Sequence, residues 1–378
     1  MCMAELTSAA QQVESNSTES SEPTLEFPLN WLLDNAAPPI QYRSFVDVAR
    51  LPASPEMETL ALASPVALKI AMTQSLDGTW NERILTLPKP GKGITGLGTI
   101  PAVERLLEYG WHRDSPPLAQ ARRPLFRLLA EDSDPHFLYE LRGSAKNPDL
   151  AIRGRQILRE ASSAALAHAG YEADPRLRGA ARRAMERIDA FLDSPLAEKP
   201  WVRIGNRHVL AEHASPPSIF ALMTVAQMPI FRSEHFPEME RLFTYLSQPK
   251  PTQEAVQLYD TEIVAQPHLV LGDLLHNKNV VESDIPFALT WLEIMARLGF
   301  LKRHEMWMKL FERFVDDCGR DRVWRPHSKT AELPATTSPY AWPKFPLESN
   351  LEGDGRWSDV TFRIGLIARL LGWQIKLV

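Results

Sequence analysis

The stretch GWHRDSPPL at residues 110–118 is matched by GYEADPRL at residues 170–177. In each, a predicted helix ends in glycine, an aromatic residue follows, and aspartate and proline precede the next helix. The glycine–aromatic pair recurs in LGF at 298–300 and LGW at 371–373. Glycine readily adopts the left-handed conformation that ends a helix, and proline is favoured in the first helical turn. Unless common cap residues merely coincide, the sequence predicts successive helical hairpins.

Apolar residues recur at helical spacing through most of the chain, whereas the alternation typical of strands is confined to residues 201–204. The helical segments are predicted at 56–74, 100–109, 117–131, 148–169, 175–192, 216–231, 235–246, 263–276, 284–298, 303–317 and 357–371. Many of these begin at or near one of the 31 prolines. The predicted fold class is therefore all-α, built as a curved array of helical hairpins.

Composition limits the function classes. The 378 residues include 42 Lys and Arg against 47 Asp and Glu, and the net charge of −5 argues against a nucleic-acid binder. Only Cys2 and Cys318 are present, so a disulfide framework is excluded and a cytoplasmic protein is expected. No apolar run reaches the length of a transmembrane segment. Residues 1–24 are polar and expected to be a disordered tail, and residues 25–378 are expected to form a single domain.

The stretch QSLDGTW at residues 74–80 closes a predicted helix with the pattern Q-x-x-x-G-x-W, and DCGRDRVW at 317–324 is a degenerate copy. This pattern resembles the repeat-closing motif of squalene and hopene cyclases, in which glutamine and tryptophan tie successive helices together. With the hairpins, the chain from about 55 to 378 resembles the α/α-toroid of the terpenoid cyclase and protein prenyltransferase superfamily. That resemblance implies an inner and an outer layer of helices around a central cavity.

The resemblance also implies where catalytic residues would lie. Class II cyclases of this superfamily use D-x-D-D, and the nearest stretch is EDSDP at 131–135, where proline takes the place of the last acid. Asp132 and Asp134 are the best available acids, although Asp134 is also the natural cap of a helix beginning at Pro135. Prenyltransferases bind zinc through D-x-C and histidine. Asp316 and Cys318 have that spacing, but they close a helix, and no metal site is predicted.

A glycine-rich loop precedes the predicted helix at 100–109 and contains the pattern G-x-G-x-x-G with Gly93 and Gly96. Its amide groups are candidates for holding an anion. No strand precedes the loop, so a dinucleotide site is not indicated, and a plain connection between helices is the alternative.

His268, Asp273 and His276 lie within the predicted helix 263–276 and form a second candidate ligand-binding set. Two imidazoles with a neighbouring carboxylate suit acid–base chemistry or metal binding. The separation of eight residues between the histidines is longer than in known helical zinc motifs, and His276 also suits a helix cap.

Tryptophans gather towards the C-terminus, and Trp291 and Trp307 are candidates for lining an apolar ligand. Aromatic faces stabilise positive charge, although filling gaps between helices is the alternative role. The stretch PATTSPYAWPKFPL at 334–347 is expected to cross the surface or cover a cavity mouth.

Two functions follow from these observations. The first is a terpenoid cyclase-like or prenyltransferase-like protein that binds or processes an isoprenoid or another apolar ligand in a central cavity. The second is a non-catalytic helical-repeat scaffold that binds a protein partner. No cofactor can be assigned from the sequence.

Overall fold

The protein is mainly helical, with two small sheets, in the residues that the computed structural model describes, namely 23–130, 148–249, 255–259, 262–276, 278–280, 282–326, 336, 338, 340–348 and 354–378. The α-helices are α1 (Leu29–Asn35), α2 (Pro38–Arg43), α3 (Pro55–Leu62), α4 (Pro65–Met72), α5 (Thr99–Glu108), α6 (Pro116–Ala130), α7 (Pro148–His168), α8 (Pro175–Leu192), α9 (Ile219–Ala226), α10 (Pro229–Glu234), α11 (Phe236–Leu246), α12 (Ile285–Arg297), α13 (Glu305–Asp316) and α14 (Ser358–Leu370). The strands are β1 (Thr24–Phe27), β2 (Trp201–Ile204), β3 (Arg207–Leu210), β4 (Val256–Tyr259), β5 (Glu262–Ala265) and β6 (Gln374–Leu377). Short turns of 3₁₀- or π-helix are η1 (Ser44–Val48), η4 (Pro195–Ala197), η5 (Glu282–Asp284), η6 (Leu301–Arg303) and η7 (Asp354–Trp357).

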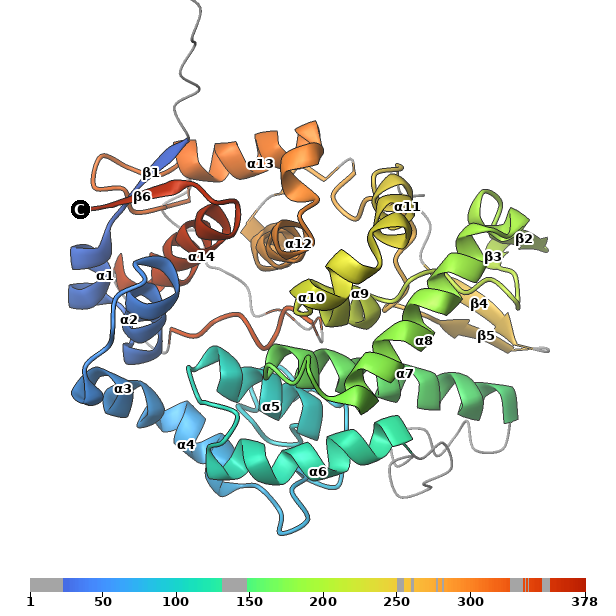
Figure 1. The fold of residues 1–378 in the computed structure, drawn as a ribbon, viewed down its shortest axis with the longest axis horizontal. Helices are drawn as coiled ribbons and strands as arrows, with labels where there is room; N and C mark the ends of the chain where they lie inside the picture. The colour runs from blue at the N-terminus through green and yellow to red at the C-terminus, as the bar shows by residue number, and fades with distance from the viewer. Residues whose placement is uncertain are drawn as a thin grey trace, which may run out of the picture.

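One set of helices, called the inner set below, is packed in a continuous succession. Helices α5, α7, α9, α12 and α14 contact one another in that order, and α14 then contacts α2 and η1. In Figure 1, α6 lies along the lower edge of the molecule, α8 at the right and α13 along the top, outside these helices. The apolar core runs between the two sets of helices.

The first and last described segments lie side by side. Strand β1 pairs in parallel with β6, with Thr24 opposite Gln374 and Phe27 opposite Leu377, as the upper left of Figure 1 shows. The Phe27 ring packs onto α14 at Gly365, where a Cβ would lie 2.3 Å from Phe27 Cε2. The absence of a side chain at Gly365 therefore lets β1 dock against α14.

Four helices of the inner set end as the repeated stretches predict. Gly110, Gly170, Gly299 and Gly372 all have positive φ angles, between 75° and 88°. In each case the N–H of the following aromatic residue donates to a carbonyl five residues earlier, at 2.9–3.1 Å. This is the Schellman pattern, which satisfies carbonyls that a helix end leaves unpaired. The predicted glycine–aromatic helix ends are confirmed at α5, α7, α12 and α14.

The turn at residues 74–80 follows α4 in the chain and contacts the first half of α6 in space. The Gln74 amide donates to the Pro117 carbonyl at 2.8 Å, at the start of α6. A Cβ on Gly78, whose φ is +86°, would lie 2.5 Å from the Gln120 carbonyl oxygen, so glycine allows the close approach. Trp80 is fully buried. Glutamine, glycine and tryptophan therefore tie two hairpins together.

The degenerate copy at 318–324 folds in the same way. The backbone N–H of Trp80 donates to Thr99 Oγ1 at 3.1 Å, and that of Trp324 donates to Thr361 Oγ1 at 3.1 Å. Each threonine lies near the start of the next inner helix, α5 or α14. The two turns are equivalent structural units at opposite ends of the chain.

Two secondary-structure predictions are wrong in part. An all-α chain was expected, but β2, β3, β4 and β5 form a four-stranded sheet, of which only the strand at 201–204 was predicted. Residues 263–276 begin as strand β5 and continue as turns. The β-branched pair Ile263 and Val264 favours a strand, and Pro267 and Gly272 then interrupt a helix. The Asp273 N–H donates to the Gln248 carbonyl at 2.7 Å, so this segment pairs with a neighbouring chain segment.

Candidate functional site

Four buried charges of alternating sign form a closed quartet in the interior. Lys344 Nζ lies 3.0 Å from Glu108 Oε1 and 2.9 Å from Glu293 Oε2. The Arg363 guanidinium bridges the same carboxylates, at 2.5 Å from Glu108 and 3.2 Å from Glu293. The side chains are between 0% and 7% exposed. Because isolated charges are very costly to bury, each member depends on its neighbours.

Helix geometry brings the quartet together from distant parts of the sequence. Glu108 is the last residue of α5, Glu293 lies in α12 and Arg363 lies in α14. Arg43, at the end of α2, pairs with Glu108, and Arg297 pairs with Glu293 at 2.9 Å. The cluster therefore joins α2, α5, α12 and α14 to the segment that carries Lys344.

The two glutamates remain ionised in this environment. Burial alone would raise the pKa of Glu108, but the charges of Arg363, Lys344 and Arg43 outweigh it and hold the pKa well below its usual range. Burial would also raise the pKa of Glu293, but the charges of Lys344, Arg297 and Arg363 outweigh it and lower the pKa. The neighbouring cations thus decide the protonation state.

The segment 340–348 passes through the interior, whereas the stretch 334–347 was expected to cross the surface or cover a cavity mouth; several residues of that stretch lie outside the described part. Ala341, Phe345 and Leu347 are buried. The Arg105 guanidinium donates to the carbonyls of Trp342 at 2.7 Å, Pro343 at 3.2 Å and Pro346. Buried carbonyls need hydrogen-bond donors, and a proline-rich segment forms no regular secondary structure that would supply them. Arg105 supplies these donors and so allows the segment to be buried.

Asp359, on α14, fixes the end of the same segment. Its two oxygens accept hydrogen bonds from the backbone N–H groups of Leu347 at 2.9 Å and Glu348 at 3.0 Å. Burial raises the pKa of Asp359 to about 6. Both oxygens are engaged with the chain itself, which suits an anchor better than a proton donor to a ligand.

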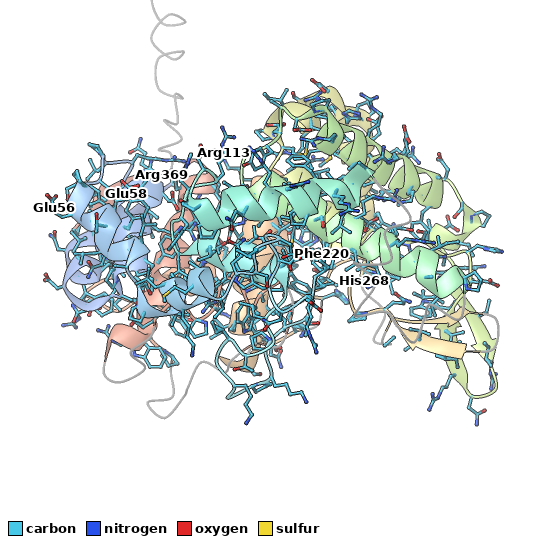
Figure 2. All side chains as sticks on the ribbon, turned by 90° about the horizontal axis from the view of Figure 1, so that it is seen from below. Glu56, Glu58, Arg113, Phe220, His268 and Arg369 are labelled. Atoms are coloured by element: carbon cyan, nitrogen blue, oxygen red, sulfur yellow. The ribbon has the colours of Figure 1, made fainter. Side chains whose placement is uncertain are left out.

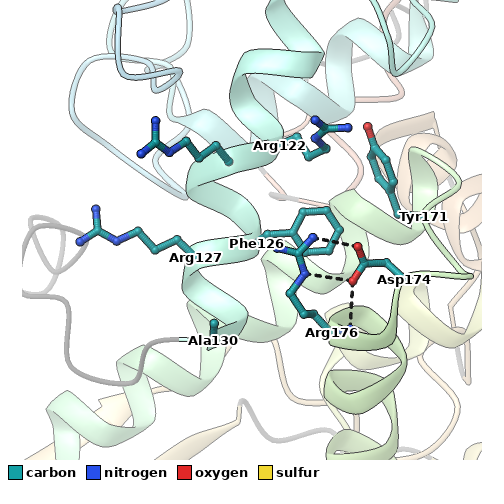
Figure 3. Close-up of a pocket in the computed structure, with 8 residues that line it drawn as sticks. Arg122, Phe126, Arg127, Ala130, Tyr171, Asp174 and Arg176 are labelled. Carbon is teal, nitrogen blue, oxygen red and sulfur yellow. Dashed lines mark hydrogen bonds and ion pairs between the residues drawn. The ribbon is translucent and has the colours of Figure 1, made fainter.

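An arginine-lined cleft lies on the outer side of α6, between that helix and the start of α8 (Figure 3). Its volume is about 910 Å³, and it is lined by Arg122, Arg123, Phe126, Arg127, Ala130, Tyr171, Asp174 and Arg176. Asp174 caps α8 and holds Arg176 at 2.8 and 3.0 Å. Neither Arg122 nor Arg123 forms an ion pair with a described residue. The cleft therefore has a surplus of positive charge.

A second cleft of about 550 Å³ lies on the other flank of α6 and shares Arg122, Arg123 and Arg127 with the first. Its rim includes Leu76 and Asp77, from the turn at 74–80. Leu76 is fully exposed and Met72 is 83% exposed. The arginines of α6 thus form a ridge between two clefts, with apolar side chains beside it.

The structure separates the residues that the sequence put forward as acids and anion binders. Asp132 and Asp134 lie outside the described residues. Gly93 and Gly96 lie in an exposed loop with φ angles of +58° and +82°. The loop leads into α5, and neither glycine is among the residues that line the two clefts.

His268, Asp273 and His276 do not share a helix face, because the helix predicted at 263–276 is absent. Asp273 is buried and accepts hydrogen bonds from Leu275 N–H and Trp307 Nε1, both at 2.8 Å. Burial lowers the pKa of His268 to about 4. The His268 carbonyl accepts from Ile219 N–H at 2.8 Å, and Figure 2 shows the residue close to Phe220. His276 is exposed.

Trp291 and Trp307 do come together. Their rings meet edge to face, with centroids 6.1 Å apart, and both side chains are buried. His304 stacks on Trp307 with ring centroids 4.1 Å apart. Trp291 belongs to α12 and Trp307 to α13, and Trp307 also donates to the buried Asp273. The two rings therefore pack in the core, which agrees with the gap-filling alternative.

Known proteins provide no further guide to the site. No family model matches the chain, and searches of curated proteins and of solved structures found no match. Among the described residues, no group of three or more histidine, cysteine, aspartate or glutamate side chains is placed to hold a metal ion. None of the helices described is both long enough and apolar enough to cross a membrane.

Sequence reasoning missed both the quartet and the cleft. For the cleft, the local signals were the adjacent cations Arg122 and Arg123 on a predicted helix and the repeated stretch 170–177, which contains Tyr171, Asp174 and Arg176. Glu108, Glu293, Lys344 and Arg363 are scattered along the chain, and no spacing rule links them.

Proposed function

We propose that this chain is a closed α/α ring that acts as a scaffold and binds an acidic segment of a partner protein along the outer face of α6. The observation that carries the proposal is the surplus of arginine on α6, where Arg122 and Arg123 have no ion-pair partner among the described residues. The chain as a whole carries a charge of −5, so this positive surface stands out from its surroundings.

Support for a closed ring comes from the order of helix contacts, which leads from α5 through α14 to α2, and from the Arg43–Glu108 pair, which joins α2 to α5. The pairing of β1 with β6 also brings the first and last described segments together. The equivalent turns at 74–80 and 318–324 add the repeat character of an α/α-toroid. The interior of this ring holds the segment 340–348 and the charged quartet. That content favours the scaffold over an isoprenoid-processing protein, which needs an apolar chamber with an available acid.

Titration of a labelled poly-glutamate peptide, followed by fluorescence anisotropy, tests the proposal. Binding should weaken at least tenfold in Arg122→Gln/Arg123→Gln and should fall as salt is raised. Arg182→Gln/Arg183→Gln is the matched control, since both residues are exposed on α8 and outside either cleft lining. Equal affinity of both double variants for the peptide would refute the proposal.

A separate measurement addresses the isoprenoid hypothesis. Farnesyl diphosphate and squalene are incubated with the protein, with and without Mg²⁺, and products and co-purified lipids are identified by mass spectrometry. A product, or a lipid retained through purification, would favour an enzyme with an internal chamber over the scaffold.

A further inference from the structure

We propose that the cleft between α6 and α8 receives a phosphorylated side chain of the acidic partner segment. This inference rests on the proposed function and names the group that the same surface recognises. It depends on three described features of the cleft: an uncompensated guanidinium, a hydroxyl without a partner, and a second guanidinium fixed in place.

The uncompensated guanidinium is that of Arg122. Its Cζ lies 5.9 Å from the centroid of the Tyr171 ring, and its exposed side chain forms no ion pair with a described residue. In Figure 3 it lies beside the Tyr171 hydroxyl. A guanidinium presents paired N–H donors that match the oxygens of a phosphate.

The hydroxyl without a partner belongs to Tyr171. It has no hydrogen-bond partner among the described residues, although it is shielded from solvent. Arg113 lies on the same ring, with its Cζ 5.2 Å from the ring centroid, and donates to the Gly170 carbonyl at 2.8 Å. Because an unsatisfied buried hydroxyl is costly, a ligand oxygen that reaches it once the exposed Arg122 side chain beside it moves gains a donor without a partner among the described residues.

The fixed guanidinium is that of Arg176. Asp174 holds it through two hydrogen bonds, and its Cζ lies 3.9 Å from the centroid of the Phe126 ring. The Asp174 pKa is lowered, chiefly by its hydrogen bond to Arg176, so the pair stays charged. Arg176 is thus oriented before any ligand arrives, which reduces the entropy lost on binding.

A phosphate fits this set of donors better than a single carboxylate does. It carries between about −1.5 and −2 charges at neutral pH and three acceptor oxygens. Arg122 and the Tyr171 hydroxyl offer donors to it, and Arg176 adds a fixed positive charge while it stays paired with Asp174.

Isothermal titration calorimetry with three peptides tests the inference. The peptides share one acidic sequence and carry phosphoserine, serine or glutamate at the central position. The phosphoserine peptide should bind at least tenfold more tightly than the glutamate peptide. Arg122→Gln should abolish that preference, and Tyr171→Phe should reduce it three- to tenfold while leaving the serine peptide unaffected. Arg182→Gln should change none of these affinities.

The outcomes separate this inference from the proposed function. Equal affinity for the phosphoserine and glutamate peptides, both lost in Arg122→Gln/Arg123→Gln, overturns phosphate recognition and leaves the acidic scaffold standing. No binding of any peptide overturns both. Inorganic phosphate that displaces the phosphopeptide with equal affinity would show a free-phosphate site instead. Binding to phosphatidylserine vesicles but to no peptide would assign the surface, with Leu76 and Met72, to a membrane. A melting curve of each variant tests whether it is folded. The substituted arginines are exposed, and Tyr171→Phe keeps the aromatic ring, so all variants should melt close to the wild type.

Discussion

The Glu108 carboxylate and the Arg363 guanidinium lie 2.5 Å apart in the interior, although 255 residues separate them in the chain. Lys344 joins the same carboxylate from the segment 340–348. One glutamate therefore connects the end of α5, the middle of α14 and a proline-rich segment. Such a connection can form only when the chain has assembled from both ends, so the quartet reports on the complete fold.

Lys344→Met should destabilise the protein strongly. The substitution leaves Glu108 and Glu293 buried with one cation fewer, and breaking a buried ion pair on one side costs about 3–5 kcal/mol. Urea unfolding of the two proteins measures the change. Lys309→Met is the control, because Lys309 pairs with Glu305 at 2.6 Å on the exposed surface of α13, where water screens the pair and it contributes little to stability. Similar small losses in both variants would contradict the role given to the quartet.

Gly365→Ala should destabilise the protein, although alanine is the better helix former. The new Cβ would meet the buried Phe27 ring at 2.3 Å, and forcing β1 away from α14 costs about 1–3 kcal/mol. Gly179→Ala in α8 provides the comparison, since its nearest neighbour is the flexible end of Arg183 at 3.7 Å. That variant should gain up to about 1 kcal/mol. Thermal unfolding distinguishes the two, and a stabilised Gly365→Ala would show that β1 is not held there.

Local signals explain which parts of the fold could be predicted. The stretches beginning at Gly110 and Gly170 predict helix ends correctly because the glycine at C′ and the aromatic residue after it close the helix through contacts within one turn. Pro148 and Pro175 mark helix starts for the same local reason, and the first helical turn lacks the hydrogen bond that proline cannot make.

The segment 263–276 shows where local signals fail. Its apolar spacing fits a helix, but its backbone pairs with strand β4 and with residues 248–249. Those partners cannot be read from the segment itself. Helix and strand are both compatible with a short apolar run, and tertiary pairing decides between them.

The candidate site was less predictable than the fold. The cleft needs α6 to lie beside the turn at Tyr171 and the start of α8, and the quartet needs four separate segments to converge. A sequence reveals which residues are charged, but not which are buried together. The aspartates chosen for their likeness to a cyclase motif, Asp132 and Asp134, lie outside the described residues, so that expectation stays a prediction.

His268 should make the protein less stable as the pH falls. Burial lowers its pKa to about 4, against an ordinary value near 6.5 in the unfolded chain; Arg153 adds to this effect and Glu160 opposes it. The unfolded state therefore binds more protons between these values, so this contribution is complete above pH 6.5 and is lost on acidification towards pH 4. At 1.36 kcal/mol per unit the loss approaches about 3 kcal/mol.

His268→Gln isolates this contribution from the carboxylates that also titrate. Urea unfolding of wild type and variant is compared between pH 4.5 and 7.5. Relative to wild type, the variant should gain stability steadily below pH 6.5. A constant difference between the two proteins across this range would show that His268 titrates normally in the folded state.

The two equivalent turns share a left-handed backbone at one position, but only the second accommodates a side chain there. Gly78 has a φ of +86° and Arg322, at the matching place before Val323 and Trp324, has a φ of +65°. Gly78→Ala should cost more than about 2 kcal/mol, because it adds left-handed strain to a Cβ 2.5 Å from the Gln120 carbonyl oxygen. Arg322→Gly relieves left-handed strain of about 1 kcal/mol. It also loses the exposed 2.6 Å ion pair with Glu26 and raises the conformational entropy of the unfolded chain. The net change in the free energy of unfolding should therefore stay within about 1 kcal/mol of zero. Chemical denaturation of both variants measures the contrast. A large loss in Arg322→Gly would mean that the arginine side chain, rather than the turn geometry, holds the second turn against α14.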